Sequence, residues 1–245
     1  LWLFRKVIRK FWVRFVELIV VLVIVLAGLN YVSEGRIIDR LTTFNIKEQI
    51  EIIKDNNTKS AKYEDIILGN NTITVKTNKE TLNININEEK LYFLDENFNI
   101  LEITTDNNRI TINDPKYNGY RITIPRNYPG ISIERATHYD WISVNFYITD
   151  RGIKIIGSGG RISEPIVAER FEPLDGIESL ASNRGYIWGR TLPLLKNYIF
   201  KGSGADNYPY AFPQDDFIAK LRTNMSASTV VDKPHNIYLQ IATNT

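Results

Sequence analysis

The sequence contains no cysteine, one methionine and only two histidines among its 245 residues. The absence of cysteine excludes a disulfide framework and every metal site built from thiolates. The two histidines, His138 and His235, are far apart in the chain, so neither has a second histidine nearby to form a metal site. A net charge of only +2 excludes a strongly basic nucleic-acid-binding protein.

The positive charge that the chain does carry is concentrated at its amino end. Residues 1–14 contain five cations and no acidic residue, and an apolar run of 18 residues follows at positions 15–32. Eighteen residues rising 1.5 Å each span about 27 Å, close to the thickness of a bilayer core. Because lysines and arginines flank the cytoplasmic side of membrane helices, this pattern predicts a transmembrane helix with a cytoplasmic amino terminus. Everything after about residue 33 is then expected to be extracytoplasmic.

Two alternatives for the apolar run are less favourable. A cleaved signal peptide has a shorter apolar core and a small-residue cleavage site, and Ala27-Gly28-Leu29 is a poor one. A buried core helix would not combine a continuous apolar run with a cationic flank. Residues 34–62 are expected to form one or two short helices and a polar linker. Because the chain begins with leucine and its last residues, 242–245, fall inside what looks like an unfinished element, we expect a fragment of a longer polypeptide.

From about residue 63 to residue 160 the pattern changes to period-two alternation with asparagine-rich turns, which is typical of antiparallel strands. Strands at a spacing of roughly ten residues predict a sandwich or curled meander. The clearest hairpin joins residues 91–94 to residues 98–101. The nine expected strands span residues 73–76, 82–86, 91–94, 100–103, 109–112, 121–124, 131–134, 142–148 and 152–156.

Three features of the sequence suggest chemistry but have simpler interpretations. Residues 157–161 (Gly-Ser-Gly-Gly-Arg) lack the Lys-Ser/Thr ending of a phosphate-binding loop, so a flexible turn is the better interpretation. His138 precedes Tyr139, Asp140 and Trp141, a group that could stack on a sugar, although packing is the more common role. The acidic pairs at residues 95–96 and 215–216 are adjacent in sequence and would point to opposite faces of a strand, so we interpret them as turn and surface acids.

The final quarter of the chain carries the residues with the strongest functional signal. A helix-period segment starts after Ser182-Asn183 and places Arg184 at its first turn. A cation is unfavourable at the positive end of a helix dipole unless an anion binds there. Arg190 lies six residues on, about 240° further around the helix, so it is either a second anion contact from the side or a plain surface cation. Further along, Pro234 favours an extended backbone before His235, which stands at the end of a loop.

Several motifs in this quarter together resemble the O-antigen ligase and O-antigen polymerase family of bacterial membrane glycosyltransferases. The matching residues are Ser182-Asn183-Arg184, Trp188, Gly202-Ser203-Gly204, and His235-Asn236 followed by Tyr238-Leu239. In that family the segment belongs to a large extracytoplasmic loop, and the histidine opens the next membrane helix. The resemblance implies that residues 161–245 are the catalytic loop segment and that residues 63–160 are a β-rich insertion.

The resemblance also implies a reaction. A glycan is transferred from a polyprenyl-diphosphate carrier to a glycan or lipid-anchored acceptor, in the assembly of cell-surface polysaccharide. Arg184 would bind the diphosphate, with Arg190 as a further candidate contact, and His235 would act as the catalytic base. An arginine fork pairs with phosphate oxygens, and a histidine ordinarily titrates near neutrality. No metal and no cofactor are expected, and the partners are the lipid-linked donor, the acceptor and membrane lipids.

Together these inferences predict an α+β protein of four parts. Residues 1–33 form the basic flank and transmembrane helix, residues 34–62 the short helices and linker, residues 63–160 the β-rich region and residues 161–245 the helical loop segment. The predicted function is glycan transfer of the ligase or polymerase type at the bacterial cell membrane. The alternative is a single-pass surface protein whose β-sandwich binds glycan or has a structural role.

Overall fold

The computed structural model falls into two compact units, Leu1–Glu51 and Ile52–Thr245. The part of the chain that it describes comprises residues 12, 15–21, 23–25, 27–28, 31–32, 50–51, 55, 61–87, 90–137, 140–198 and 200–244. The described residues of the first unit are helical. Among all described residues, no helix is long and apolar enough to cross a membrane, and the predicted run at residues 15–32 is described only in pieces. Most of the predicted linker region lies outside the described residues.

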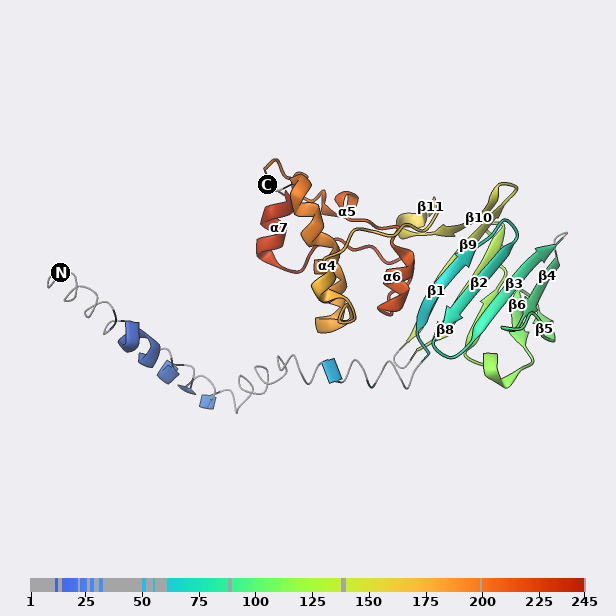
Figure 1. Cartoon of the computed structure of the whole chain (residues 1–245), viewed down its shortest axis with the longest axis horizontal. Coiled ribbons are helices and arrows are strands. Elements are labelled where there is room, and N and C mark those ends of the chain that lie inside the picture. The colour runs from blue at the N-terminus through green and yellow to red at the C-terminus, as the bar shows by residue number, and fades with distance from the viewer. Residues whose placement is uncertain are drawn as a thin grey trace. The chain divides into compact units, whose positions relative to one another are not determined.

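The second unit is built on two antiparallel sheets, each made of strands that pair in chain order (Figure 1). The first sheet contains β1 (Tyr63–Leu68), β2 (Thr72–Thr77), β3 (Thr81–Asn87) and β4 (Lys90–Leu94). The second contains β5 (Ile103–Asp106), β6 (Arg109–Ile112), β7 (Tyr120–Thr123), β8 (Gly130–Ala136), β9 (Trp141–Thr149), β10 (Gly152–Ile156) and β11 (Ile162–Ser163). Both sheets are therefore meanders.

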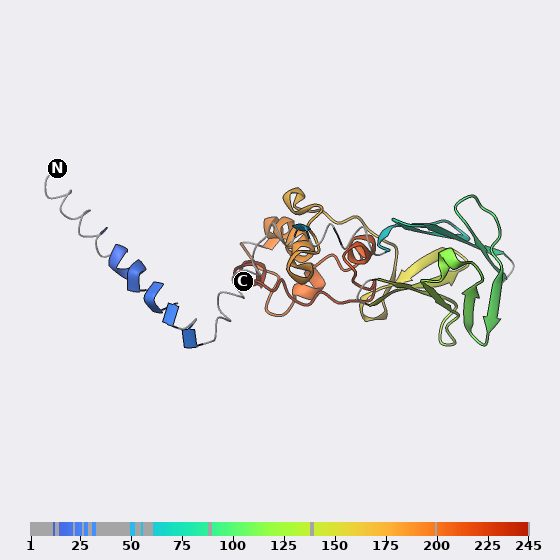
Figure 2. The same ribbon diagram turned by 90° about the horizontal axis from the view of Figure 1, so that it is seen from below.

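The alternation of residues along the strands explains why the two sheets form a sandwich. In β9, for example, Ile142, Val144 and Phe146 are buried, and the residues between them are half-buried. The inward-facing residues of both sheets belong to one hydrophobic core, and Figure 2 shows the sheets as two layers. Successive side chains of a strand point to opposite faces, so alternation in the sequence is enough to define the buried face. The predicted antiparallel sandwich is confirmed.

The strand predictions differ from the structure at two places. Two strands, β1 and β11, were not expected, so the described residues form eleven strands where the sequence predicted nine. The strand predicted at residues 100–103 is wrong: β5 begins only at Ile103, and Ile100 makes an isolated bridge to Leu94. The predicted hairpin around residues 95–97 therefore forms only a short contact where the chain crosses from one sheet to the other.

Helices dominate the rest of the unit. The α-helices are α4 (Leu180–Tyr198), α5 (Tyr208–Ala211), α6 (Phe217–Arg222) and α7 (Ile237–Asn244), and the short 3-10 helices are η1 (Pro115–Tyr117), η2 (Ser158–Gly160) and η3 (Glu172–Leu174). The expected helix at about residues 186–199 is confirmed as α4. A second, smaller core joins α4, α5 and α6, and its buried members are Tyr186, Ile187, Tyr208, Phe212, Ala219 and Val231. The fold class is α+β, as predicted.

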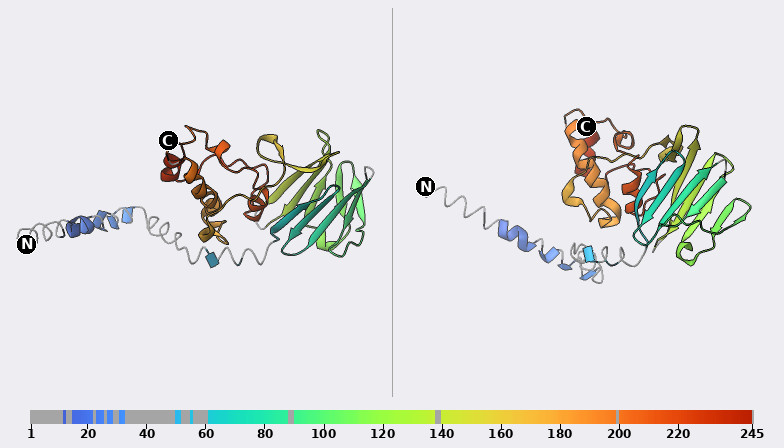
Figure 3. Two further views of the ribbon diagram at one scale, coloured as in Figure 1. Left: turned by 45° about the horizontal axis from the view of Figure 1, so that its top comes forward. Right: turned by 45° about the vertical axis from the view of Figure 1, so that its right-hand side comes forward.

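Helix α6 belongs to both cores. Phe217 and Leu221 are fully buried in the core of the sandwich, and α6 packs against β1, as both views in Figure 3 show. Arg222 Nε donates a 2.7 Å hydrogen bond to the carbonyl oxygen of Glu64 in β1. A Cβ on Gly157 would lie 2.6 Å from the Phe217 ring, so the glycine makes room for that side chain. The sandwich core therefore continues beyond residue 160, the predicted boundary between the β-rich region and the helical loop segment.

Candidate functional site

The first turn of α4 has an irregular backbone directly before Arg184. Ala181, Ser182 and Asn183 have φ angles of 52°, 57° and 67°, so the regular helix begins after Asn183. Residues other than glycine rarely adopt this left-handed backbone conformation, and its energetic cost is typical of functional or tightly constrained sites. Arg184 itself is exposed. The predicted helix start at Ser182-Asn183 is thus confirmed, and it displays the predicted anion-binding arginine to solvent.

Gly185 allows the loop before α4 to pack closely against the first turn of the helix. Gly185 is buried, and a Cβ at this position would come 2.4 Å from the carbonyl oxygen of Ile177. The next residue, Tyr186, donates its backbone N–H to the carbonyl oxygen of Glu178 at 2.8 Å. Because the chain before the helix is held so closely, the backbone that carries Arg184 is held in place on its buried side.

A proline inside α4 is tolerated because its missing hydrogen bond is replaced. Pro193 has no N–H, which leaves the carbonyl oxygen of Gly189, four residues earlier, without its helical partner. That oxygen accepts a 2.8 Å hydrogen bond from the backbone N–H of Phe171. A buried carbonyl without a partner would be costly, so this bond ties the segment before the helix to the middle of α4.

Trp188 connects α4 to the loop that carries His235. Its indole Nε1 donates a 2.8 Å hydrogen bond to the carbonyl oxygen of Pro234. His235 follows with a φ of 51°, a second strained backbone position beside a predicted catalytic residue, and its side chain is exposed. Residues four apart in a helix lie on the same face, so Trp188 stands one turn from Arg184 on the same side of α4. The structure therefore brings the two sequence motifs together, 46 residues apart in the chain.

Asn236 begins helix α7. Its Oδ1 accepts hydrogen bonds from the backbone N–H groups of Tyr238, at 3.0 Å, and Leu239, at 3.2 Å. These are the contacts of a helix N-cap, which satisfies donors that have no partner within the helix. The His-Asn pair of the motif thus combines an exposed side chain with the residue that starts the helix.

The turn at residues 202–204 also packs against α7. Both the backbone N–H and the Oγ of Ser203 donate to the carbonyl oxygen of Thr243, at 2.7 and 2.8 Å. A pocket of about 340 Å³ lies beside this turn and is lined in part by Tyr198, Asn207 and Tyr210. Arg184 lies at the other end of α4, roughly 20 Å away along a 14-residue stretch of helix. The pocket and the Arg184–His235 region are therefore separate places on the segment.

Arg190 was expected to be either a second anion contact or a plain surface cation, and its position in the structure fits neither role. It is not a surface cation: only 4% of the residue is exposed, and its Nε donates a 2.7 Å hydrogen bond to Asp216 Oδ2. Its guanidinium also lies 5.1 Å from the centre of the Tyr186 ring. Burial raises the pKa of the Asp216 carboxyl, while the hydrogen bond from Arg190 opposes that shift. The expectation that Asp216 is a surface acid is wrong, and these contacts favour a structural role for Arg190.

A buried lysine joins the predicted flexible turn at residues 157–161 to the helical segment. Lys220 Nζ is fully buried and donates to three oxygens: Thr229 O at 2.7 Å, Ser158 Oγ at 3.1 Å and Gln214 Oε1 at 3.1 Å. Burial lowers the pKa of Lys220 to about 8. Nothing in the local sequence signalled this cluster, because its members are up to 71 residues apart.

The structure thus leaves Arg184 and His235 exposed on neighbouring elements and buries Arg190. His138, the other histidine, and Tyr139 lie outside the described residues. Among the residues that are described, no group of three or more histidine, aspartate or glutamate side chains could hold a metal ion. Trp188 and Asn236 position the site, and both stand in the motifs that the sequence had already singled out.

No protein-family model, no curated protein and no solved structure matches this chain.

Proposed function

We propose that this chain is part of a bacterial membrane glycosyltransferase of the O-antigen ligase or polymerase type. It would transfer a glycan from a polyprenyl-diphosphate carrier to a glycan or lipid-anchored acceptor during the assembly of surface polysaccharide. In this proposal Arg184 binds the diphosphate and His235 is the catalytic base. Residues 1–14 are cytoplasmic, residues 15–32 anchor the chain in the membrane, and the second unit is extracytoplasmic.

The observation that carries the proposal is the hydrogen bond from Trp188 Nε1 to the carbonyl oxygen of Pro234. It holds the residue before His235 against the face of α4 that presents Arg184 one turn away. The motifs that contain Trp188 and His235 therefore lie together, while the turn at residues 202–204 bonds to Thr243 near the end of α7. An exposed arginine and an exposed histidine, held on neighbouring elements by this bond, support a shared catalytic task.

The reaction assigned to the two residues is a single displacement. The acceptor hydroxyl oxygen attacks the anomeric carbon of the donor, and the bond from that carbon to the diphosphate oxygen breaks. His235 takes the hydroxyl proton, and the polyprenyl diphosphate leaves with its negative charge paired to Arg184. An arginine suits this place because its fork of donors stays charged and matches phosphate oxygens.

Two surfaces favour a membrane location for this reaction. Helix α7, which starts directly after His235-Asn236, exposes Ile237, Tyr238 and Ile241 to extents of 62%, 80% and 56%. At the other end of the chain, every described residue within positions 15–32 is exposed, although nearly all are apolar. Contiguous exposed apolar surface is typical of a membrane or interaction face. A lipid-linked donor would be presented at such a face.

The test uses the complete gene product in membranes, with a lipid-linked glycan donor and analysis of the transferred product. We expect His235→Ala and Arg184→Ala to remove transfer, because loss of a general base alone commonly costs about 100- to 10,000-fold. Arg184→Lys should restore little activity, since a point charge cannot make a bidentate phosphate contact.

Lys196→Ala is the matched control. Lys196 is an exposed cation on the same helix and forms a surface ion pair with Glu169. This variant should keep normal activity and normal protein level. Near-normal transfer by His235→Ala would contradict the assignment and return the segment to a structural role, and loss of wild-type activity on treatment with EDTA would contradict the metal-independent mechanism.

A further inference from the structure

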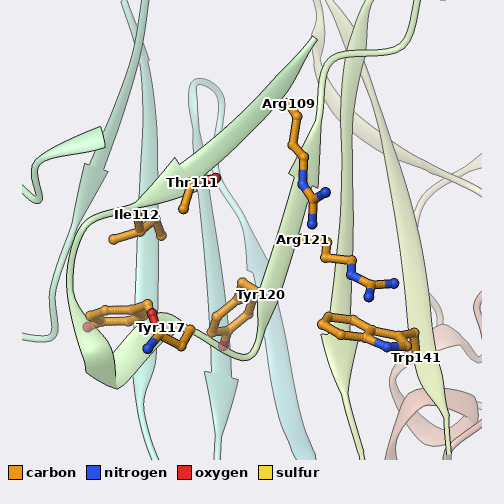
Figure 4. A pocket seen from close by; sticks show the side chains of 8 residues that line it. Arg109, Thr111, Ile112, Tyr117, Tyr120, Arg121 and Trp141 are labelled. Carbon is orange, nitrogen blue, oxygen red and sulfur yellow. The ribbon is translucent and has the colours of Figure 1, made fainter. Parts of the chain in front are cut away.

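A second pocket lies on the sandwich, away from the helical segment of residues 161–245. It is a pocket of about 290 Å³ lined by residues of the second sheet and the adjoining η1 turn, and Figure 4 shows its side chains. Arg109 and Thr111 of β6 reach it because they alternate with the buried Ile110 and Ile112 and so face outward. Arg121 of β7 faces outward for the same reason. The arginines of the pocket therefore come from the solvent side of the sheet, while the core residues Ile112, Tyr117 and Tyr120 complete its lining.

One arginine of the pocket is held in place by a tryptophan. The guanidinium carbon of Arg121 lies 3.6 Å from the centre of the Trp141 ring, and Figure 4 shows the guanidinium over the ring. Stacking on an aromatic face attracts the cation and orders its side chain, while the N–H groups on the guanidinium edge stay available as donors. Arg121 is thus a preorganised donor fork rather than a freely moving surface cation.

Each of the two positive charges of the pocket has a carboxylate residue opposite it on a neighbouring strand. Glu134 lies opposite Arg121 on β8, and Asp106 lies opposite Arg109 on β5. Even so, no carboxylate of a described residue forms an ion pair with either guanidinium, whereas eight other cations of the described chain do have such partners. In Figure 4 the side chain of Arg109 points toward Arg121. Two like charges that share a hollow without a counterion favour the binding of an anion there.

We propose that this pocket binds the carboxylate of an acidic sugar, a hexuronate unit of a glycan chain. A planar carboxylate matches the donor fork of an arginine, and such charge-assisted pairs are the strong hydrogen bonds of proteins. Asn118 and Thr111 supply an amide and a hydroxyl within the same pocket for the sugar hydroxyls. The volume is at the lower end of ligand pockets and suits one sugar unit. This site is independent of the transferase proposal.

The test is calorimetric titration of the full chain with oligogalacturonate, a neutral galacto-oligosaccharide of the same length, and inorganic phosphate. We expect oligogalacturonate to bind, and the neutral oligosaccharide to bind at least about 10-fold more weakly, because it lacks the charged hydrogen bonds. Arg109→Gln and Arg121→Gln should each weaken oligogalacturonate binding by about 10-fold or more for the same reason. The affinity should also fall as salt is added.

Arg126→Gln is the control, because Arg126 is an exposed cation of the loop between β7 and β8 and does not line the pocket. It removes the same charge and should leave binding unchanged. Equal affinities for the neutral and acidic oligosaccharides would overturn the proposal, as would Arg121→Gln binding as tightly as Arg126→Gln. Phosphate that binds as tightly as oligogalacturonate would overturn the sugar assignment. Unchanged circular dichroism of each variant separates these outcomes from misfolding.

Discussion

The sandwich and the helical segment bury apolar and polar residues in different proportions. The core of the sandwich is a single cluster of apolar side chains from two meandering sheets. The helical segment has a core of only six buried apolar residues, yet after residue 180 it buries seven polar or charged ones, among them Arg190, Asp216 and Lys220. An apolar core depends on volume and pattern, whereas a buried charge depends on one particular partner. The sandwich has one such pair, Arg135 with Glu80, beside a large apolar core, whereas the helical segment has a small apolar core and relies more on its buried polar contacts.

The backbone shows the same contrast. Of the eight described non-glycine residues with positive φ, six lie after residue 180, and one of these is His235. Three others directly precede Arg184. Strained backbone persists only where surrounding contacts enforce it, and it is concentrated at functional sites. The segment with the smaller apolar core therefore carries more residues with positive φ.

The largest expected loss of stability comes from a change where the sandwich and the helical segment meet. Phe217→Ala should lower the free energy of unfolding by about 4 kcal/mol, since it leaves a cavity in a core to which both sheets contribute. Urea unfolding followed by circular dichroism of the strands and by fluorescence of Trp188, in a parent protein whose other three tryptophans are replaced by phenylalanine, should show one coincident transition. Two separate transitions in this parent protein would show that the sandwich and the helical segment are independent.

The second-largest expected loss of stability tests whether the Arg190–Asp216 ion pair stabilises the helical segment. Arg190→Met leaves the Asp216 carboxylate buried without its partner and should cost about 3 kcal/mol. The double variant Arg190→Met with Asp216→Leu should recover most of this loss, because no charge then stays buried. A double variant as unstable as the single one would mean that apolar volume, rather than charge pairing, decides stability here.

A pH effect of intermediate size is expected from Lys220. Burial lowers its pKa to about 8 in the folded state, so between pH 8 and pH 10 the unfolded chain binds the extra proton more strongly. Stability in this window should rise with pH by roughly 1 kcal/mol per pH unit relative to Lys220→Met. The comparison with the variant cancels the buried tyrosines, which act in the opposite direction above about pH 10. Parallel pH profiles for wild type and variant would contradict the lowered pKa.

The smallest effect concerns the start of α7. Asn236→Ala removes the oxygen that accepts from Tyr238 and Leu239 and should cost about 1 kcal/mol. Asn236→Asp keeps an accepting oxygen and should cost less. In the transfer assay Asn236→Ala should reduce activity less than His235→Ala, because Asn236 positions the helix and does not move a proton. A loss as large as that of His235→Ala would require a direct catalytic role for Asn236.

Most of the sandwich could be predicted from the sequence because alternation directly encodes which face is buried. Strand β10 was predicted with its observed bounds, and β6 likewise. Strand β1 was not predicted because Glu64 and Asp65 break the apolar pattern, and a register shift occurs between Tyr63 and Asp65. Strand β5 was misplaced because all four of its residues are exposed, so no buried face marks it.

The candidate site was predictable only in part. The motifs identified Arg184, Trp188 and the His-Asn pair, since each is a short local signal. They could not show that Arg190 is buried, because its partner Asp216 lies 26 residues further along the chain. The arginine pocket on the sandwich could not be predicted either, because it depends on the strand register, which places residues from β6, β7 and β9 on one face.

The position of α6 also has a consequence for biosynthesis. Its contact with β1 joins Arg222 to Glu64 across 158 residues of sequence. On the ribosome, roughly 60 residues must still be added after β10 before Phe217 can enter the core, which takes about 3 to 12 seconds at ordinary elongation rates. During this interval the core beside β1 is open to water and to other nascent chains. Synthesis that pauses between β10 and α6 should therefore increase chaperone binding and aggregation.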